Sequence, residues 1–239
     1  MHIGVLGATG PAGRGLTARL ASLGHDVILG SREHEKAAGV VDELREEWGT
    51  RVASMLPGTN EVAAAAADLV IIATTWEGAV STARDHATQL TGKVVVSMAN
   101  GLEKVGREFR PVLPPEGSVS AAVQAAAPAA RVVSAFQHVP ASSFADLDEP
   151  LRGDIVVCAD DDEAREVVLD LVTTMPALRA FDGGTLANAV GIEAFAALLL
   201  SINLRHKGKG SLQLIGVEGR GVEGRGVEGR VVDGRGAAR

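Results

Sequence analysis

The stretch His2-Ile-Gly-Val-Leu-Gly-Ala-Thr-Gly-Pro-Ala-Gly13 decides the fold of this chain. Residues 2–6 are an apolar run that predicts a buried strand, and Pro11 stands where a helix begins, since its missing N–H is not needed there. Gly10 lets the backbone approach a pyrophosphate, and Gly13 lets the helix pack closely on the strand. Because a helix N-terminus favours negative charge, this turn indicates a dinucleotide site. The alternative is a tight structural turn without a ligand.

Outward from this turn, apolar runs alternate with amphipathic helical segments over most of the chain. Strands that are apolar throughout, separated by helices, are typical of a parallel sheet covered on both faces. We therefore expect an α/β fold, a doubly wound Rossmann-type parallel sheet with a short C-terminal helical extension and a disordered tail. The further expected strands are 26–30, 68–73, 93–97, 131–135, 154–158 and 178–182, and the expected helices are 11–23, 33–48, 78–90 and 162–174.

Three regions follow from this pattern. Residues 1–182 form the expected dinucleotide-binding Rossmann domain. Residues 183–215 form a C-terminal segment with an apolar helix over 185–205, whose only charge before its end is Glu193, and a last strand over 212–215. A helix that is apolar nearly all round is expected in a core or a subunit interface. Residues 216–239 repeat Gly-Val-Glu-Gly-Arg three times, a low-complexity tail expected to be disordered, with an interaction arm as the alternative.

Composition excludes several classes of partner. The 239 residues are 46% hydrophobic and carry a formal net charge of −7, so the basic surface that nucleic acid requires is missing. The single cysteine, Cys158, suits a reducing cytoplasm. The N-terminus lacks the shape of a signal peptide, and the most apolar stretch, 194–202, is too short to span a bilayer. We expect a cytoplasmic protein without a membrane or nucleic-acid partner.

The end of the second strand indicates which dinucleotide binds. An NAD site places a carboxylate there to hold the ribose 2′-hydroxyl. This chain has Ser31 and Arg32 instead, with Lys36 one turn later. A hydroxyl, a guanidinium and an ammonium suit a 2′-phosphate, so the residues favour NADP over NAD.

The chain offers few groups for acid–base chemistry. It contains no tyrosine, so the phenolic proton donor of short-chain reductases is absent. His138 follows a strand and could face the cleft or the surface. The acidic run 160–163 precedes a helix, which favours capping over metal binding. We therefore predict no catalytic acid or base and no metal site, which suits an acceptor that supplies its own chemistry, such as a flavin-like ring.

Several segments together resemble the NADPH-dependent reductases of coenzyme F420, over about residues 1–215. The resemblance rests on the turn Ile3-Gly-Val-Leu-Gly-Ala-Thr-Gly10, on Gly24-His-Asp-Val-Ile-Leu-Gly-Ser-Arg32 and on Trp76. It also rests on Val133-Ser-Ala-Phe-Gln-His-Val-Pro-Ala141, Phe144-Ala-Asp-Leu-Asp148 and Val157-Cys-Ala-Asp-Asp-Asp-Glu163.

The resemblance implies direct hydride exchange between NADP(H) and the deazaflavin coenzyme F420 in a homodimer. The protein would only position the two rings, so no catalytic group is named. Residues 9–12 would hold the phosphates, and Thr74, Trp76 and Asn100 would line the nicotinamide side. The expected cofactor-binding residues are Thr9, Gly10, Pro11, Ala12, Gly13, Ser31, Arg32, Lys36, Thr74, Trp76, Asn100, His138, Val139, Ala141 and Leu212.

Two other functions stay open. One is an NADP-dependent imine reductase resembling pyrroline-carboxylate reductases, although those enzymes usually need a longer helical domain than residues 185–215. The other is a non-catalytic NADPH-binding module, which the alanine-rich late helix keeps open.

Overall fold

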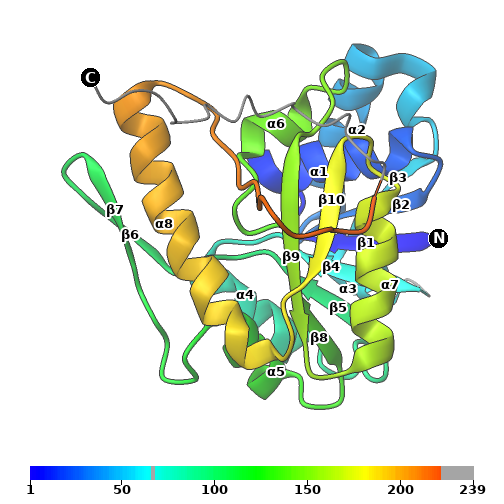
Figure 1. Cartoon of the computed structure of the whole chain (residues 1–239). Helices are drawn as coiled ribbons and strands as arrows, with labels where there is room; N and C mark the ends of the chain where they lie inside the picture. The colour runs from blue at the N-terminus through cyan, green and yellow to red at the C-terminus, as the bar shows by residue number, and fades with distance from the viewer. Residues whose placement is uncertain (66–67, 222–239) are drawn as a thin grey trace, which may run out of the picture.

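The computed structural model describes residues 1–65 and 68–221. Its centre is an eight-stranded sheet in the order β10-β9-β8-β5-β4-β1-β2-β3, and β6 and β7 form a separate hairpin (Figure 1). The strands are β1 (His2–Leu6), β2 (Asp26–Ser31), β3 (Met55–Thr59), β4 (Leu69–Ile72), β5 (Val94–Ser97), β6 (Leu102–Val105), β7 (Glu108–Pro111), β8 (Arg131–Ser134), β9 (Gly153–Ala159) and β10 (Leu178–Asp182). The helices are α1 (Pro11–Ser22), α2 (His34–Trp48), α3 (Asn60–Ala64), α4 (Trp76–Asp85), α5 (Val119–Ala126), α6 (Ala141–Ala145), α7 (Asp162–Thr173) and α8 (Ala189–His206).

The predicted doubly wound architecture is confirmed. Helices α1, α2 and α7 contribute side chains to the core on one face of the sheet, and α3, α4 and α5 to the core on the other. The central strands are buried on both faces, since all four residues of β4 and all four of β5 are buried, and only Ser97 among these eight is polar. Burial on both faces explains why these strands read as continuous apolar runs in the sequence.

One strand pair departs from the expected parallel arrangement. β8 and β9 pair antiparallel, through Val133 with Ala159 and Ser134 with Cys158. After β8 the chain forms only the five-residue helix α6, which packs against α1, so it returns along the same edge of the sheet without crossing it. A parallel connection needs a crossover, usually a longer helix. As a result, the start of β9 lies at the edge where β5 and β8 end.

Other local predictions need correction. Helix α4 begins at Trp76 and ends at Asp85, earlier than the expected 78–90. Strands β3, β6 and β7 had no counterpart among the expected strands. Residues 212–215 form no strand; they run beside β9 in extended form, with Asp154 N–H donating to Leu212 O at 2.9 Å.

The expected apolar helix 185–205 is confirmed as α8, preceded by the short 3₁₀ turn Leu186–Asn188. The stretch Leu186–His206 is long and apolar enough to cross a membrane by length and composition alone. The prediction that the most apolar stretch is too short to do so considered only residues 194–202 and was wrong on this point. Core helices of soluble proteins meet the same criteria. In this structure, 44% of the most apolar part of Leu186–His206 is buried inside the protein. Helix α8 packs along the β6–β7 hairpin (Figure 1).

The first residues of the repeat tail contact the folded body. After α8, the chain crosses in front of β9 and β10 toward α7 (orange to red in Figure 1). Arg220 then forms an antiparallel bridge with Ala180 of β10. The expected disorder therefore does not apply to residues 216–221, and the remainder of the predicted tail, 222–239, lies outside the described residues.

Candidate functional site

The phosphate-type turn has the predicted form. Gly7 adopts a φ of 68°, and a Cβ there would lie 2.2 Å from Thr74 Cγ2, so only glycine fits. Its N–H donates to Asn60 Oδ1 at 3.0 Å, a contact that the sequence did not reveal because Asn60 lies on α3. A Cβ at Gly13 would lie 2.7 Å from Ala8 Cα, so the first turn of α1 packs closely on the turn that follows β1.

Helix α1 presents an open N-terminus at this turn. Gly10 is its N-cap, no side chain caps it, and no acidic residue stands in its first turn. A Cβ at Gly10 would meet no atom within 4 Å. The first N–H groups of the helix therefore face space in which an anion can be accommodated.

The three residues expected at a 2′-phosphate lie together where β2 passes into α2. Ser31 ends β2 and is buried, whereas Arg32 and Lys36 are exposed. Neither cation forms an ion pair with the residues that the structure describes. Both charges are thus available at the edge of the sheet next to the turn.

A cavity of about 200 Å³ opens between this turn and α8, and we name it the α8 cavity. Ala12 lines it from the turn, Met98 and Asn100 from the segment after β5, and residues 136–141 from the loop after β8. Helix α8 closes it with Ala196, Leu199, Leu200 and Asn203. Five of the predicted residues line this cavity, namely Ala12, Asn100, His138, Val139 and Ala141.

Several polar atoms around the α8 cavity are buried without a hydrogen-bond partner. Asn100 Oδ1 and His138 Nδ1 belong to lining residues, and Thr74 Oγ1 lies at the end of β4 on the same edge. The side chain of Asn100 is held in this orientation, because its Nδ2 donates to Gln137 O at 2.7 Å. Buried polar groups in proteins are nearly always paired, so these atoms are candidates for contact with a polar ligand or an ordered water.

His138 faces the interior, which answers the question that the sequence left open. Its side chain is 95% buried, and Nε2 lies 2.6 Å from the carbonyl oxygen of Asp154. Burial lowers the pKa of His138 below the ordinary 6.5, while the hydrogen bond to Asp154 opposes this in part. A neutral ring that donates from Nε2 leaves Nδ1 as an acceptor.

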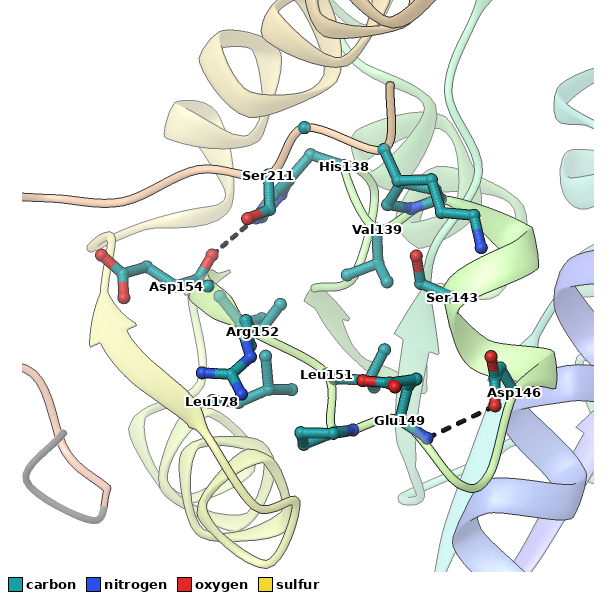
Figure 2. A pocket seen from close by; sticks show the side chains of 16 residues that line it. His138, Val139, Ser143, Asp146, Glu149, Leu151, Arg152, Asp154, Leu178 and Ser211 are labelled. Carbon is teal, nitrogen blue, oxygen red and sulfur yellow. Dashed lines mark hydrogen bonds between the residues drawn. The ribbon is translucent and has the colours of Figure 1, made fainter. Parts of the chain in front are cut away.

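A second cavity of about 430 Å³ adjoins the first, and we name it the α6 cavity. His138, Val139 and Pro140 line both cavities. Figure 2 shows Val139 and Leu151 between two groups of residues: Ser143 of α6 and Asp146 just after it on one side, and Leu178 and Asp154 on the other. Residues 209–211 complete the wall.

The α6 wall is held by Arg19 of α1, a residue that the sequence analysis did not select. Its buried guanidinium donates to the carbonyls of Ser143 at 3.1 Å, Phe144 at 3.3 Å, Asp146 and Glu149 at 3.1 Å. The partners lie more than 120 residues away, so no local pattern identifies this role. One side chain therefore connects the phosphate-facing helix to the cavity wall.

Leu212 lies on the segment beside β9 and lines neither cavity. The buried carboxylate of Asp154 receives a bidentate contact from Arg179, at 2.8 and 2.7 Å, and the N–H of Leu214 at 2.5 Å. Arg179 also donates to Leu214 O at 2.7 Å. This ion pair fixes residues 212–214, and with them residues 209–211 at the edge of the α6 cavity.

Helix α8 is anchored over its cavity by Glu193. This carboxylate is 97% buried and accepts from Val119 N at 2.7 Å, Ser120 N at 3.0 Å and Ser120 Oγ at 2.8 Å, at the N-terminus of α5. Burial raises the pKa of Glu193 above the ordinary 4.5, although these hydrogen bonds oppose it. Glu193 lies about one turn before Ala196, so it ties the part of α8 that closes the cavity to the N-terminus of α5.

The remaining predicted residues lie outside both cavities on the same edge of the sheet. Trp76 is half-buried in the first turn of α4. The others in this group are Thr9, Gly10, Pro11, Gly13, Ser31, Arg32, Lys36, Thr74 and Leu212.

The acidic run 160–163 acts as the sequence predicted. Asp161 Oδ1 accepts from Ala164 N at 2.7 Å and caps α7, and Asp160 Oδ1 accepts from Leu186 N at 3.0 Å. Among the described residues, no group of three His, Cys, Asp or Glu side chains is placed to hold a metal ion.

Comparisons with known proteins identify the family of this chain. The sequence model of the family described as NADP oxidoreductase, coenzyme F420-dependent, matches residues 2–101. An F420-dependent NADP reductase of Methanocaldococcus jannaschii is 38% identical over 215 residues, which cover 88% of this chain and 96% of that protein. The corresponding protein of Methanothermobacter thermautotrophicus is 33% identical over 87% of this chain and 91% of its own length.

A solved structure from Arthrobacter sp. FB24, assigned as an F420-dependent NADP reductase, has the same fold. It superposes with a TM-score of 0.72 at 26% identity and covers 90% of this chain and 99% of its own. On the identity and coverage of these relatives, this chain belongs to the F420-dependent NADP reductase family.

Proposed function

We propose that this chain transfers a hydride between NADPH and coenzyme F420 in the joined α8 and α6 cavities. The family membership supports the reaction. The observation that carries the proposal is the group of unpaired buried atoms, Thr74 Oγ1, Asn100 Oδ1 and His138 Nδ1, beside the open N-terminus of α1. A nicotinamide carboxamide whose phosphates lie on that helix could supply the missing partners.

The two bound rings supply the redox chemistry: a C–H bond of the dihydronicotinamide breaks, its hydrogen and electron pair pass to a deazaflavin carbon, and solvent supplies one proton. The residues of the chain hold both rings in place. Residues 9–13 bind the pyrophosphate, and Ser31, Arg32 and Lys36 bind the 2′-phosphate. Positioning of this kind can account for most of a barrier reduction.

We further assign Thr74, Trp76 and Asn100 to the nicotinamide side, and Val139, Ala141 and Leu212 to the deazaflavin side. His138 contacts the rings without donating a proton, because its buried Nε2 is engaged with Asp154 O. The walls that exclude water are Leu199 and Leu200 of α8.

The test is a spectrophotometric assay with purified protein, NADPH and oxidised F420. We expect loss of the visible band of F420, much faster with NADPH than with NADH. Tight NADPH binding without bleaching would overturn the proposed acceptor; turnover of cyclic imines would then assign an imine reductase, and binding without any turnover a non-catalytic module.

We also propose a cytoplasmic homodimer with α8 as its seam. Three apolar side chains of α8 are exposed, Leu198 at 56%, Ile202 at 41% and Leu204 at 40%. The chain has a single cysteine, Cys158, and therefore no internal disulfide, which suits a reducing compartment. Light scattering should give twice the chain mass, and Leu198→Arg should give the monomer. A wild-type monomer would refute the seam.

A further inference from the structure

The exposed edge of the main sheet is occupied by a piece of the repeat tail. Strand β10 is the last strand of the sheet, and Arg220 pairs with it through Ala180 N to Arg220 O at 2.7 Å and Arg220 N to Ala180 O at 2.8 Å. Edge strands are ready templates for an added extended segment. The tail therefore uses a general mode of peptide recognition.

Two acidic side chains of α7 select the arginine. The guanidinium of Arg220 makes a bidentate contact with Glu166, with Nη2 2.9 Å from Oε1, and Nη1 lies 4.0 Å from Asp170 Oδ1. Glu166 and Asp170 are one helical turn apart and so present adjacent carboxylates. A planar guanidinium suits this geometry better than an ammonium.

Both neighbours of Arg220 are glycines, and the position of Gly221 requires one. A Cβ at Gly219 would lie 2.5 Å from the ring of Phe181. A Cβ at Gly221 would lie 2.5 Å from Leu178 O, and the φ of Gly221 is 135°, which side chains rarely adopt. The site thus recognises Gly-Arg-Gly in three ways. The backbone of Arg220 pairs with β10, its guanidinium contacts Glu166, and the neighbouring glycines leave room for the close approach.

The same triplet occurs again in the tail, at 224–226 and 234–236. The third repeat unit ends differently, since Gly229-Arg230 is followed by Val231. By the geometry at Gly221, a valine side chain would collide with Leu178 O. The chain therefore has one docking site, three Gly-Arg-Gly triplets that fit it and one Gly-Arg-Val triplet that does not.

We propose that the β10 edge with Glu166 and Asp170 is a docking site for Gly-Arg-Gly, and that a tail triplet of a second copy of this chain occupies it when the internal triplet leaves. A single site can hold only one of the three triplets, which leaves two free to bind elsewhere. The chain beyond Gly221 continues to residue 239 and spans roughly 60 Å when extended, enough to reach a neighbouring copy. Tail and site carry opposite charges at their centres.

The first experiment measures peptide binding to the full-length chain carrying Arg220→Gln, Arg225→Gln and Arg235→Gln, which weakens all internal triplets. The probe is a fluorescent peptide with the sequence of residues 222–228, and the control peptide carries Gly226→Val. We expect the probe to bind at least tenfold more tightly than the control. Adding Glu166→Gln to the receptor should weaken binding at least fivefold. Equal binding of both peptides, or no saturable binding, would overturn the docking site.

The second experiment tests exchange between copies. Full-length chains labelled at the N-terminus with donor and acceptor dyes are mixed, and energy transfer is compared with that of chains carrying Arg225→Gln and Arg235→Gln. Any dimer through α8 contributes equally to both samples. We expect a larger signal for the unaltered tail, reduced by salt and by Glu166→Gln. Identical signals would overturn the occupant from a second copy.

Discussion

Replacing Glu193 by alanine should weaken the fold and the cleft together. The change leaves three buried donors unpaired, Val119 N, Ser120 N and Ser120 Oγ, each costing about 1–3 kcal/mol. Removing the buried carboxylate also removes its own desolvation cost, which offsets part of this loss. We expect a net decrease of about 2–4 kcal/mol in the free energy of unfolding.

Glu193→Gln provides a graded comparison. Its carbonyl oxygen can still accept from Ser120, whereas its amide would face the N–H of Val119, so about 1–2 kcal/mol is expected. Exposed Glu163→Gln on α7 is the matched control and should stay within about 0.5 kcal/mol. Since α8 lines its cavity one turn after Glu193, and that cavity holds residues assigned to both rings, KM for NADPH and KM for F420 should both rise in Glu193→Gln.

The pH dependence gives an independent readout. The pKa of Glu193 is raised in the folded state, so this carboxyl favours folding most below the ordinary value of 4.5 and loses that contribution as pH rises through the folded pKa. The stability difference between wild type and Glu193→Gln should therefore shrink from pH 4 to pH 8. The measurement is urea unfolding at each pH. Unchanged unfolding midpoints and unchanged KM in both variants would refute the anchoring role.

Three further predictions concern the nucleotide side and His138. Arg32→Ala should weaken NADPH binding by ~1.5–3 kcal/mol and leave NADH binding nearly unchanged; calorimetry showing equal losses would contradict the 2′-phosphate assignment. Gly10→Ala meets no protein atom and should fold normally yet bind NADPH more weakly, whereas Gly13→Ala should lower the melting temperature because its Cβ would lie 2.7 Å from Ala8 Cα; the reverse order would refute the turn geometry. The pKa of His138 is lowered by burial, so wild type should lose stability as pH falls below 6.5, and His138→Asn should lose less; parallel curves in urea unfolding would exclude this contribution.

The features that the sequence predicted are those fixed by local physics. The turn at residues 7–13 depends on glycine freedom and a helix N-terminus, and both act within a few residues. Strands such as β4 were visible because burial on both faces demands an unbroken apolar run. The cap at Asp161 was likewise readable three residues from its partner.

The features that were missed depend on partners far along the chain. Arg19 and Glu193 contact groups that lie 124–130 and 73–74 residues away, so no short pattern marks them. The antiparallel β9 followed from the shortness of α6, which the sequence did not delimit. The docking of Arg220 was missed because the repeat itself buries almost no apolar surface.

The ion pair at Asp154 has a consequence for the order in which the protein matures on the ribosome. Translation completes β9 well before Arg179 and Leu214, the groups that neutralise and cover its buried carboxylate. Until they emerge, a charge destined for the interior stays in water and holds that end of β9 open. The nucleotide half can close first, whereas the neighbouring cavity matures only after Leu214 has been made.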